Sequence, residues 1–180
     1  YAEALMASGE FQKAEDMIKQ VLNDQTEAKQ TYAVADIALM VKDLDNAEAA
    51  YKKGMSLAGS QDRGNAGLNK VTQARQTSAD DTRVGNELSK KNQWDGAISK
   101  FRNAISTNPS LADAHLGLAR ALEKSKNPNS QALLEAVQHY GFYLNLRTDM
   151  PAKDREKMTK DTAKLQEKAL KLKEKENRRK

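Results

Sequence analysis

The stretch of sequence that decides the fold is Asn92–Lys124, NQWDGAISKFRNAISTNPSLADAHLGLARALEK. Its first half carries a large apolar side chain at every third or fourth position, namely at Trp94, Ile98, Phe101 and Ile105. This spacing places the side chains on one face of an amphipathic helix. The helix has to end at Asn108, because the proline that follows disfavours helical backbone in the residue before it.

The second half of the stretch predicts another helix that packs against the first. Ser110 is a suitable N-terminal cap, and apolar or small residues follow at helical spacing, at Leu111, Ala114, Leu118, Ala119 and Leu122. The alanines and Gly117 let the two backbones approach closely, and the large side chains fill the space between them. We therefore expect an antiparallel hairpin that buries Trp94 and Phe101 and that needs neighbouring hairpins of its own kind.

These residues resemble the tetratricopeptide repeat. The family's order of a small residue, an aromatic residue, a small residue and a proline is met by Ala97, Phe101, Ala104 and Pro109. Trp94 lies one turn earlier, and Asn92 stands where the family usually has glycine. The resemblance implies an all-α fold, a right-handed superhelical solenoid of helix hairpins, whose surface binds other proteins.

Composition favours helices. Aromatic residues make up 5% of the 180 residues and there are three prolines, so long helices are favoured over sheets. Cysteine is absent, which excludes disulfides, thiolate zinc sites and thiol catalysis but does not indicate a compartment. No run approaches the roughly 20 apolar residues of a membrane span. Because Tyr1 begins inside a helical pattern, we expect the chain to be a fragment or trimmed form of a longer protein.

Residues 1–60 repeat the pattern, with the first helix of the first repeat truncated. Ala14 and Ala47 correspond to Ala97 and are 33 residues apart, close to the family's period. In the second of these repeats, either Lys42 or Asp43 replaces the turn glycine.

Extra chain separates these repeats from the next one, because Ala47 and Ala97 are 50 residues apart. The intervening small and apolar positions step by three and four without a proline, which predicts one long helix. In the alternative, the helix breaks at 77–81 and Ser78 caps a separate helix. The predicted parts are repeats in 1–60, a linking helix in 61–91, repeats in 79–150, and a basic capping helix and tail in 151–180.

Positive charge is concentrated at the C-terminus. The whole chain has a net charge of +5, and residues 151–180 hold 12 basic and 6 acidic residues. Since the charges alternate in sign and no aromatic residue lies among them, we expect a solvated helix that caps the solenoid. The alternative is a contact with phosphates or an anionic membrane surface through Lys171, Lys173, Lys175, Arg178, Arg179 and Lys180.

No pattern indicates catalysis. His115 and His139 have no paired carboxylate or second ligand at metal-binding spacing, and there is no glycine-rich phosphate loop or nucleophile elbow. We expect both histidines to serve packing or to lie on the surface. The chain is therefore predicted to have no catalytic, cofactor or metal site and to be no enzyme.

The resemblance implies that the first helix of each repeat lines a concave groove. Its groove positions correspond to Tyr32, Asp36, Leu39, Thr82, Asn86, Ser89, Lys90, Asp113, Leu116, Arg120 and Lys124. The predicted binding residues among them are Asn86, Lys90, Arg120, Lys124, Tyr32 and Asp36. The cations among them suit an acidic segment, and an ordinary solvated face is the alternative. The family's clamp for terminal carboxylates needs basic residues where this chain has Asp113 and Gly117, which disfavours the chaperone-tail subtype.

We expect a non-enzymatic scaffold that holds a protein or peptide in this groove. By analogy alone, the composition resembles bacterial repeat proteins of envelope assembly or secretion systems, which favours a periplasmic or outer-membrane-associated site over the cytoplasm. One alternative is an adaptor that contacts nucleic acid or an anionic membrane surface through its basic helix, and another is a regulatory domain of a larger enzyme. Nucleic acid and membrane are not the expected partners, and an oligomer is compatible with the sequence.

Overall fold

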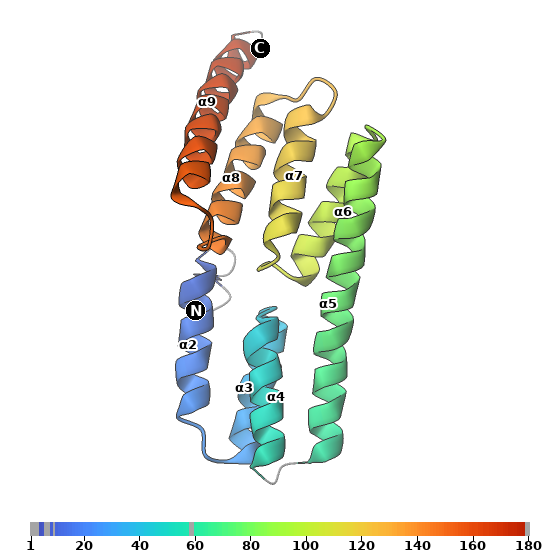
Figure 1. Ribbon diagram of the computed structural model, residues 1–180, viewed down its shortest axis with the longest axis vertical. Coiled ribbons are helices and arrows are strands. Elements are labelled where there is room, and N and C mark those ends of the chain that lie inside the picture. Colours follow the sequence, from blue (N-terminus) through green and yellow to red (C-terminus); the bar gives the residue numbers. More distant parts are fainter. Residues whose placement is uncertain (1–3, 6–7, 9, 58–59, 179–180) are drawn as a thin grey trace. The chain divides into compact units, whose positions relative to one another are not determined.

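The structure is a computed structural model that describes residues 4–5, 8, 10–57 and 60–178 of the chain (Figure 1). Within these ranges the regular elements are helices and there is no strand, so the predicted all-α fold of helix hairpins is confirmed. The elements are α2 (Phe11–Asn23), α3 (Ala28–Met40), α4 (Leu44–Ser56), α5 (Gln61–Lys90), α6 (Trp94–Thr107), α7 (Ala112–Lys124), α8 (Ser130–Leu146) and α9 (Ala152–Asn177). No described helix is both long and apolar enough to cross a membrane.

Contacts divide the chain into two compact units. Unit 1 comprises Tyr1–Ala79 and Ser106–Ser110, and unit 2 comprises Asp80–Ile105 and Leu111–Lys180. The boundary at Ala79 lies inside α5, so this helix contributes to both units. The four ranges predicted from the sequence as separate parts stay predictions.

Helix α5 is continuous over its 30 residues, about 45 Å at the standard rise. The alternative with a break at 77–81 is wrong. Ser78 is 1% exposed, and its hydroxyl donates to the Arg75 carbonyl oxygen at 2.9 Å. A serine that bonds back to the preceding turn stays inside a helix, whereas a capping serine accepts from backbone N–H groups of the next one.

Unit 1 packs two tyrosines against glycines. Helices α3 and α4 form a hairpin, and α2 contacts both. Tyr51 of α4 faces Gly67 of α5, where an added Cβ would lie 2.2 Å from the Tyr51 ring. Tyr32 of α3 faces Gly54 in the same way, at 2.5 Å. Both rings are 2% exposed. The core can pack this closely only because these glycines have no side chain to overlap the rings.

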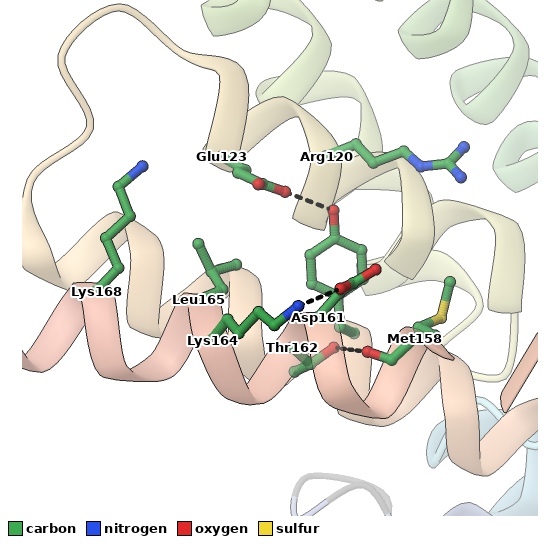
Figure 2. A pocket seen from close by; sticks show the side chains of 9 residues that line it. Arg120, Glu123, Met158, Asp161, Thr162, Lys164, Leu165 and Lys168 are labelled. Carbon is green, nitrogen blue, oxygen red and sulfur yellow. Dashed lines mark hydrogen bonds and ion pairs between the residues drawn. The ribbon is translucent and has the colours of Figure 1, made fainter. Parts of the chain in front are cut away.

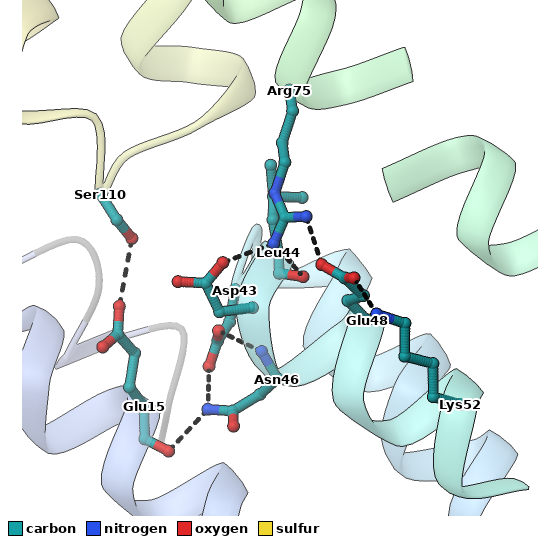
Figure 3. Close-up of polar contacts among 9 residues, drawn as sticks. Glu15, Asp43, Leu44, Asn46, Glu48, Lys52, Arg75 and Ser110 are labelled. Atoms are coloured by element: carbon teal, nitrogen blue, oxygen red, sulfur yellow. Dashed lines mark hydrogen bonds and ion pairs between the residues drawn. The ribbon is translucent and has the colours of Figure 1, made fainter. Parts of the chain in front are cut away.

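The turn between α3 and α4 combines a left-handed residue with a cap. Lys42 has φ 67°, so of the two candidates Lys42 and Asp43 it is Lys42 that takes the left-handed position of this turn. Asp43 follows, 1% exposed, and its carboxylate accepts from the backbone N–H and the side-chain amide of Asn46 at 3.1 and 2.8 Å. Figure 3 shows this cap beside Arg75, which pairs with Asp45 and Glu48 at the start of α4. Burial raises the pKa of Asp43 in spite of these bonds.

Lys42→Gly tests the turn. A lysine in left-handed backbone is strained, whereas glycine adopts it freely. The substitution should raise the free energy of unfolding by about 0.5–1 kcal/mol, measured by urea denaturation. Lys19→Gly, at an exposed position inside α2, is the matched control and should lower it by about 1 kcal/mol. A loss of stability in Lys42→Gly would contradict the assigned turn.

Unit 2 is organised around Phe101 of α6, which is fully buried. Its ring lies between Gly85 of α5 and Gly117 of α7, where an added Cβ would approach the ring to 2.8 and 2.3 Å. The predicted hairpin of α6 and α7 is therefore present with Phe101 at its centre. Trp94 is less buried than Phe101, but it packs against the same core.

Helix α9 covers α8 at the C-terminal end of unit 2. Leu165 and Ala169 are buried there, at 7% and 0% exposure. Near the end of α9, the Glu176 carboxylate accepts from the backbone N–H of Ser130 at 3.1 Å and from its hydroxyl, at the first residue of α8. A carboxylate at a helix N-terminus satisfies N–H groups that the helix itself leaves unpaired. The basic helix is thus docked on the repeats.

Gly117→Ala tests the glycine contact with Phe101. The new Cβ would overlap the ring, so the free energy of unfolding should fall by about 1–3 kcal/mol in thermal or urea denaturation. Gly141→Ala is the control, because nothing lies within 4 Å of a Cβ placed there. That substitution should raise stability by about 0.5–1 kcal/mol, as expected for alanine inside a helix. Equal effects of the two substitutions would refute the close contact.

Candidate protein-binding groove

Unit 2 has a concavity of about 600 Å³ between α5 and α7, which we call the first concavity. Residues on each helix recur at spacings of three and four, so each helix presents one face to it. Trp94, the first residue of α6, contributes an aromatic side chain. The lining residues are Asn86, Ser89, Lys90, Trp94, Asp113, Leu116, Gly117, Arg120 and Lys124.

Four of the predicted binding residues lie together at this concavity. Asn86 and Lys90 come from α5, and Arg120 and Lys124 come from α7. All four are exposed, and none of the three cations forms an ion pair with another described residue. Asp113 is the single carboxylate of the lining. The first concavity therefore carries an excess of positive charge on side chains that the core does not use.

The other two predicted residues belong to unit 1, where Tyr32 is buried and Asp36 is exposed but forms hydrogen bonds with its neighbours. Tyr32 is 2% exposed and donates its hydroxyl proton to the Ser60 carbonyl oxygen at 2.7 Å. Asp36 accepts from the Tyr51 hydroxyl at 2.6 Å and from Arg63 at 2.8 Å. Partial burial acts to raise the pKa of Asp36, but these bonds outweigh it and hold the pKa below its usual value. A buried ring offers little surface to a partner, and the binding roles of Tyr32 and Asp36 stay predictions.

A second concavity, of about 480 Å³, lies between α7 and α9. Figure 2 shows Arg120 and Glu123 of α7 on one side, and Met158, Asp161, Leu165 and Lys168 of α9 on the other. Its lining is completed by Tyr140, Thr162 and Lys164.

Internal contacts engage both carboxylates of the second concavity. Tyr140 donates its hydroxyl proton to Glu123 at 2.8 Å, and Lys164 lies 3.5 Å from Asp161. Burial, and then the bond to Glu123, raise the pKa of Tyr140, so its phenol stays protonated. Sequence reasoning missed this concavity because it treated α9 only as a cap. The available signal is the spacing of Met158 and Leu165, which are seven residues apart and share a helix face.

The two histidines, predicted to serve packing or to lie on the surface, contact each other. The Nδ1 atoms of His115 and His139 are 2.8 Å apart, and the ring of Phe142 stands nearly perpendicular to both imidazoles. His115 is 1% exposed. Burial, followed by the proximity of His115 and Arg102, lowers the pKa of His139 to about 4. In the described part of the chain, no group of three or more His, Cys, Asp or Glu side chains is placed to hold a metal ion.

The histidine pair predicts a pH dependence of stability. The pKa of His139 is about 4 when folded, against 6.5 for the free side chain, so the unfolded chain binds the additional proton between these values. Stability therefore falls as the pH drops from 6.5 to 4, by up to about 3 kcal/mol. Urea denaturation across this range should show a steeper fall for the wild type than for His139→Gln. Parallel curves would contradict the assignment.

One family of known proteins matches part of the chain. Residues 85–126 match the family described as TPR repeat, and this range covers the end of α5, all of α6 and all of α7. This part of the chain is therefore similar to a tetratricopeptide repeat. A solved structure described as a TPR2AB-domain:pHSP90 complex of yeast Sti1 is similar over 93% of this chain and 82% of that chain, with 15% identity and a TM-score of 0.30. No curated protein matches the chain.

Proposed function

We propose that this protein is a non-enzymatic scaffold whose first concavity binds a peptide segment of a partner protein. The observation that carries the proposal is the convergence of Asn86, Lys90, Arg120 and Lys124 on one hollow of the tetratricopeptide repeat. Each is an exposed polar side chain on a helix whose opposite face packs in the core. A surface held in place by such packing loses little conformational entropy on binding.

The lining suits a polar segment with a negative charge. Arg120 can bind a carboxylate through two parallel hydrogen bonds, and Lys90 and Lys124 add positive charge on either side. The Asn86 amide can both donate to and accept from a peptide backbone. Trp94, partly exposed at the edge, offers the kind of aromatic surface that often dominates binding energy.

The cellular system in which the scaffold works is part of the proposal. We place the scaffold in a bacterial envelope assembly or secretion system, by analogy of composition alone. The adaptor role of the basic helix stays the alternative: Leu165 and Ala169 pack one face of α9 onto the repeats, and Lys171, Lys173 and Lys175 are exposed.

Site-specific photo-crosslinking tests the proposed groove. A photoreactive amino acid at Asn86 should crosslink a partner in lysate of the source organism, whereas the same group at Gln138, an exposed position on α8, should not. Lys90→Glu combined with Arg120→Glu should abolish the crosslink while the melting temperature changes by only a few degrees, as for most surface substitutions.

The charge-matched control is Lys171→Glu combined with Lys173→Glu on the exposed side of α9. This variant should retain the crosslink. Loss of the partner in the control, together with retention in the groove variant, would overturn the proposal and assign binding to the basic helix.

A further inference from the structure

We propose that the bound segment is an extended, acidic peptide that continues from the first concavity into the second, where it places an apolar side chain. This inference rests on the proposed function and names the chemistry of its partner. Arg120 is the residue that joins the two sites, since it lines both concavities.

Charge supports an acidic partner along the whole path. The cations that line the two concavities are Lys90, Arg120, Lys124, Lys164 and Lys168, against three carboxylates, Asp113, Glu123 and Asp161. Glu123 already accepts from Tyr140, and Asp161 already pairs with Lys164. Four cations are therefore left without an ion pair in the described part of the chain. A carboxylate-bearing peptide would satisfy them, whereas a basic one would be repelled.

The first concavity has apolar residues in Trp94 and Leu116, and the second has an apolar wall of its own. Met158 and Leu165 share one face of α9, and the ring of Tyr140 adjoins them. Leu165 is 7% exposed, so packing holds it in place, and Met158 is partly exposed, so its side chain is accessible to a ligand. Lys168 lies one turn beyond Leu165. An aliphatic side chain that enters here would bury apolar area against Met158 while its neighbouring carboxylate meets Lys168 or Arg120.

The helix geometry sets the spacing of the two anchors. An α-helix with its side chains is about 10–12 Å across, and both concavities adjoin α7. We therefore place the acidic anchor and the apolar anchor about 10 Å apart, which an extended chain covers in about three residues. The expected motif is an acidic residue separated from a leucine or methionine by two or three positions.

A synthetic peptide array provides the probe. Its peptides are 12 residues long, carry one pair of glutamates and one leucine, and vary the separation between them from one to six positions. A matched array replaces each glutamate by glutamine. Wild-type protein should bind best at a separation of about three, and the glutamine peptides should bind at least about tenfold more weakly. Equal binding of glutamate and glutamine peptides would overturn the inference.

Peptide binding by variants distinguishes a role of the second concavity from the proposed role of the first. Lys168→Glu and Met158→Gln should each weaken the best glutamate–leucine peptide by about tenfold or more and abolish the preference for its spacing. Lys157→Glu, an exposed position of α9 outside both linings, is the matched control and should bind as the wild type does. Unchanged melting temperatures establish that the variants are folded.

Two outcomes would count against these conclusions in different ways. If Lys168→Glu and Met158→Gln bind the peptide as the wild type does while Lys90→Glu does not, the inference fails and the first concavity remains the binding site. If Lys90→Glu also binds normally and the crosslink at Asn86 is absent, the proposed function fails with it.

Discussion

The ring of Phe101 can lie between α5 and α7 only because both helices have glycine where they face it. A side chain at Gly85 or Gly117 would overlap the ring, so the distance between the two helices is set by this one buried contact. The same glycines adjoin the groove, because Asn86 follows Gly85 and Leu116 precedes Gly117. The width of the first concavity is therefore a property of the core and not of any loop.

Equivalent polar positions in the two units form different contacts. Tyr51 of unit 1 corresponds to Phe101 of unit 2 in the repeat pattern, and Asp36 corresponds to Asn86. The hydroxyl of Tyr51 needs a partner when its ring is buried, and Asp36 supplies it. Phe101 has no hydroxyl and engages no such partner. Both polar positions are exposed, but Asp36 forms hydrogen bonds with Tyr51 and Arg63 of unit 1, whereas Asn86 has no buried hydroxyl to bind in unit 2.

Local spacing predicts the helices and the hairpin of unit 2, because a proline, a cap and a step of three or four residues act within a few turns. Ser78 marks the limit of this reasoning, since serine suits a helix start and a helix interior alike and only its burial decides. The contact of His115 with His139 depends on the rotation of α7 against α8, which spacing within one helix does not specify. The second concavity is lined by α7, α8 and α9 together. The spacing within α9 shows that Met158 and Leu165 share a face, but it does not show which helix this face meets.

Helix α5 belongs to both units, and the boundary between Ala79 and Asp80 falls inside its hydrogen-bonded backbone. A protease would find no loop at this crossing, whereas the crossing between Ser110 and Leu111 lies in the turn between α6 and α7. A chain divided between Ala79 and Asp80 would leave four carbonyl groups unpaired on one fragment and four N–H groups on the other. Residues 61–79 of α5 belong to unit 1 and residues 80–90 belong to unit 2. Unfolding of one unit would therefore expose an end of the α5 segment that belongs to the other unit. The stabilities of the two units are therefore coupled through α5. A fragment meant to contain one unit should keep the whole of residues 61–90.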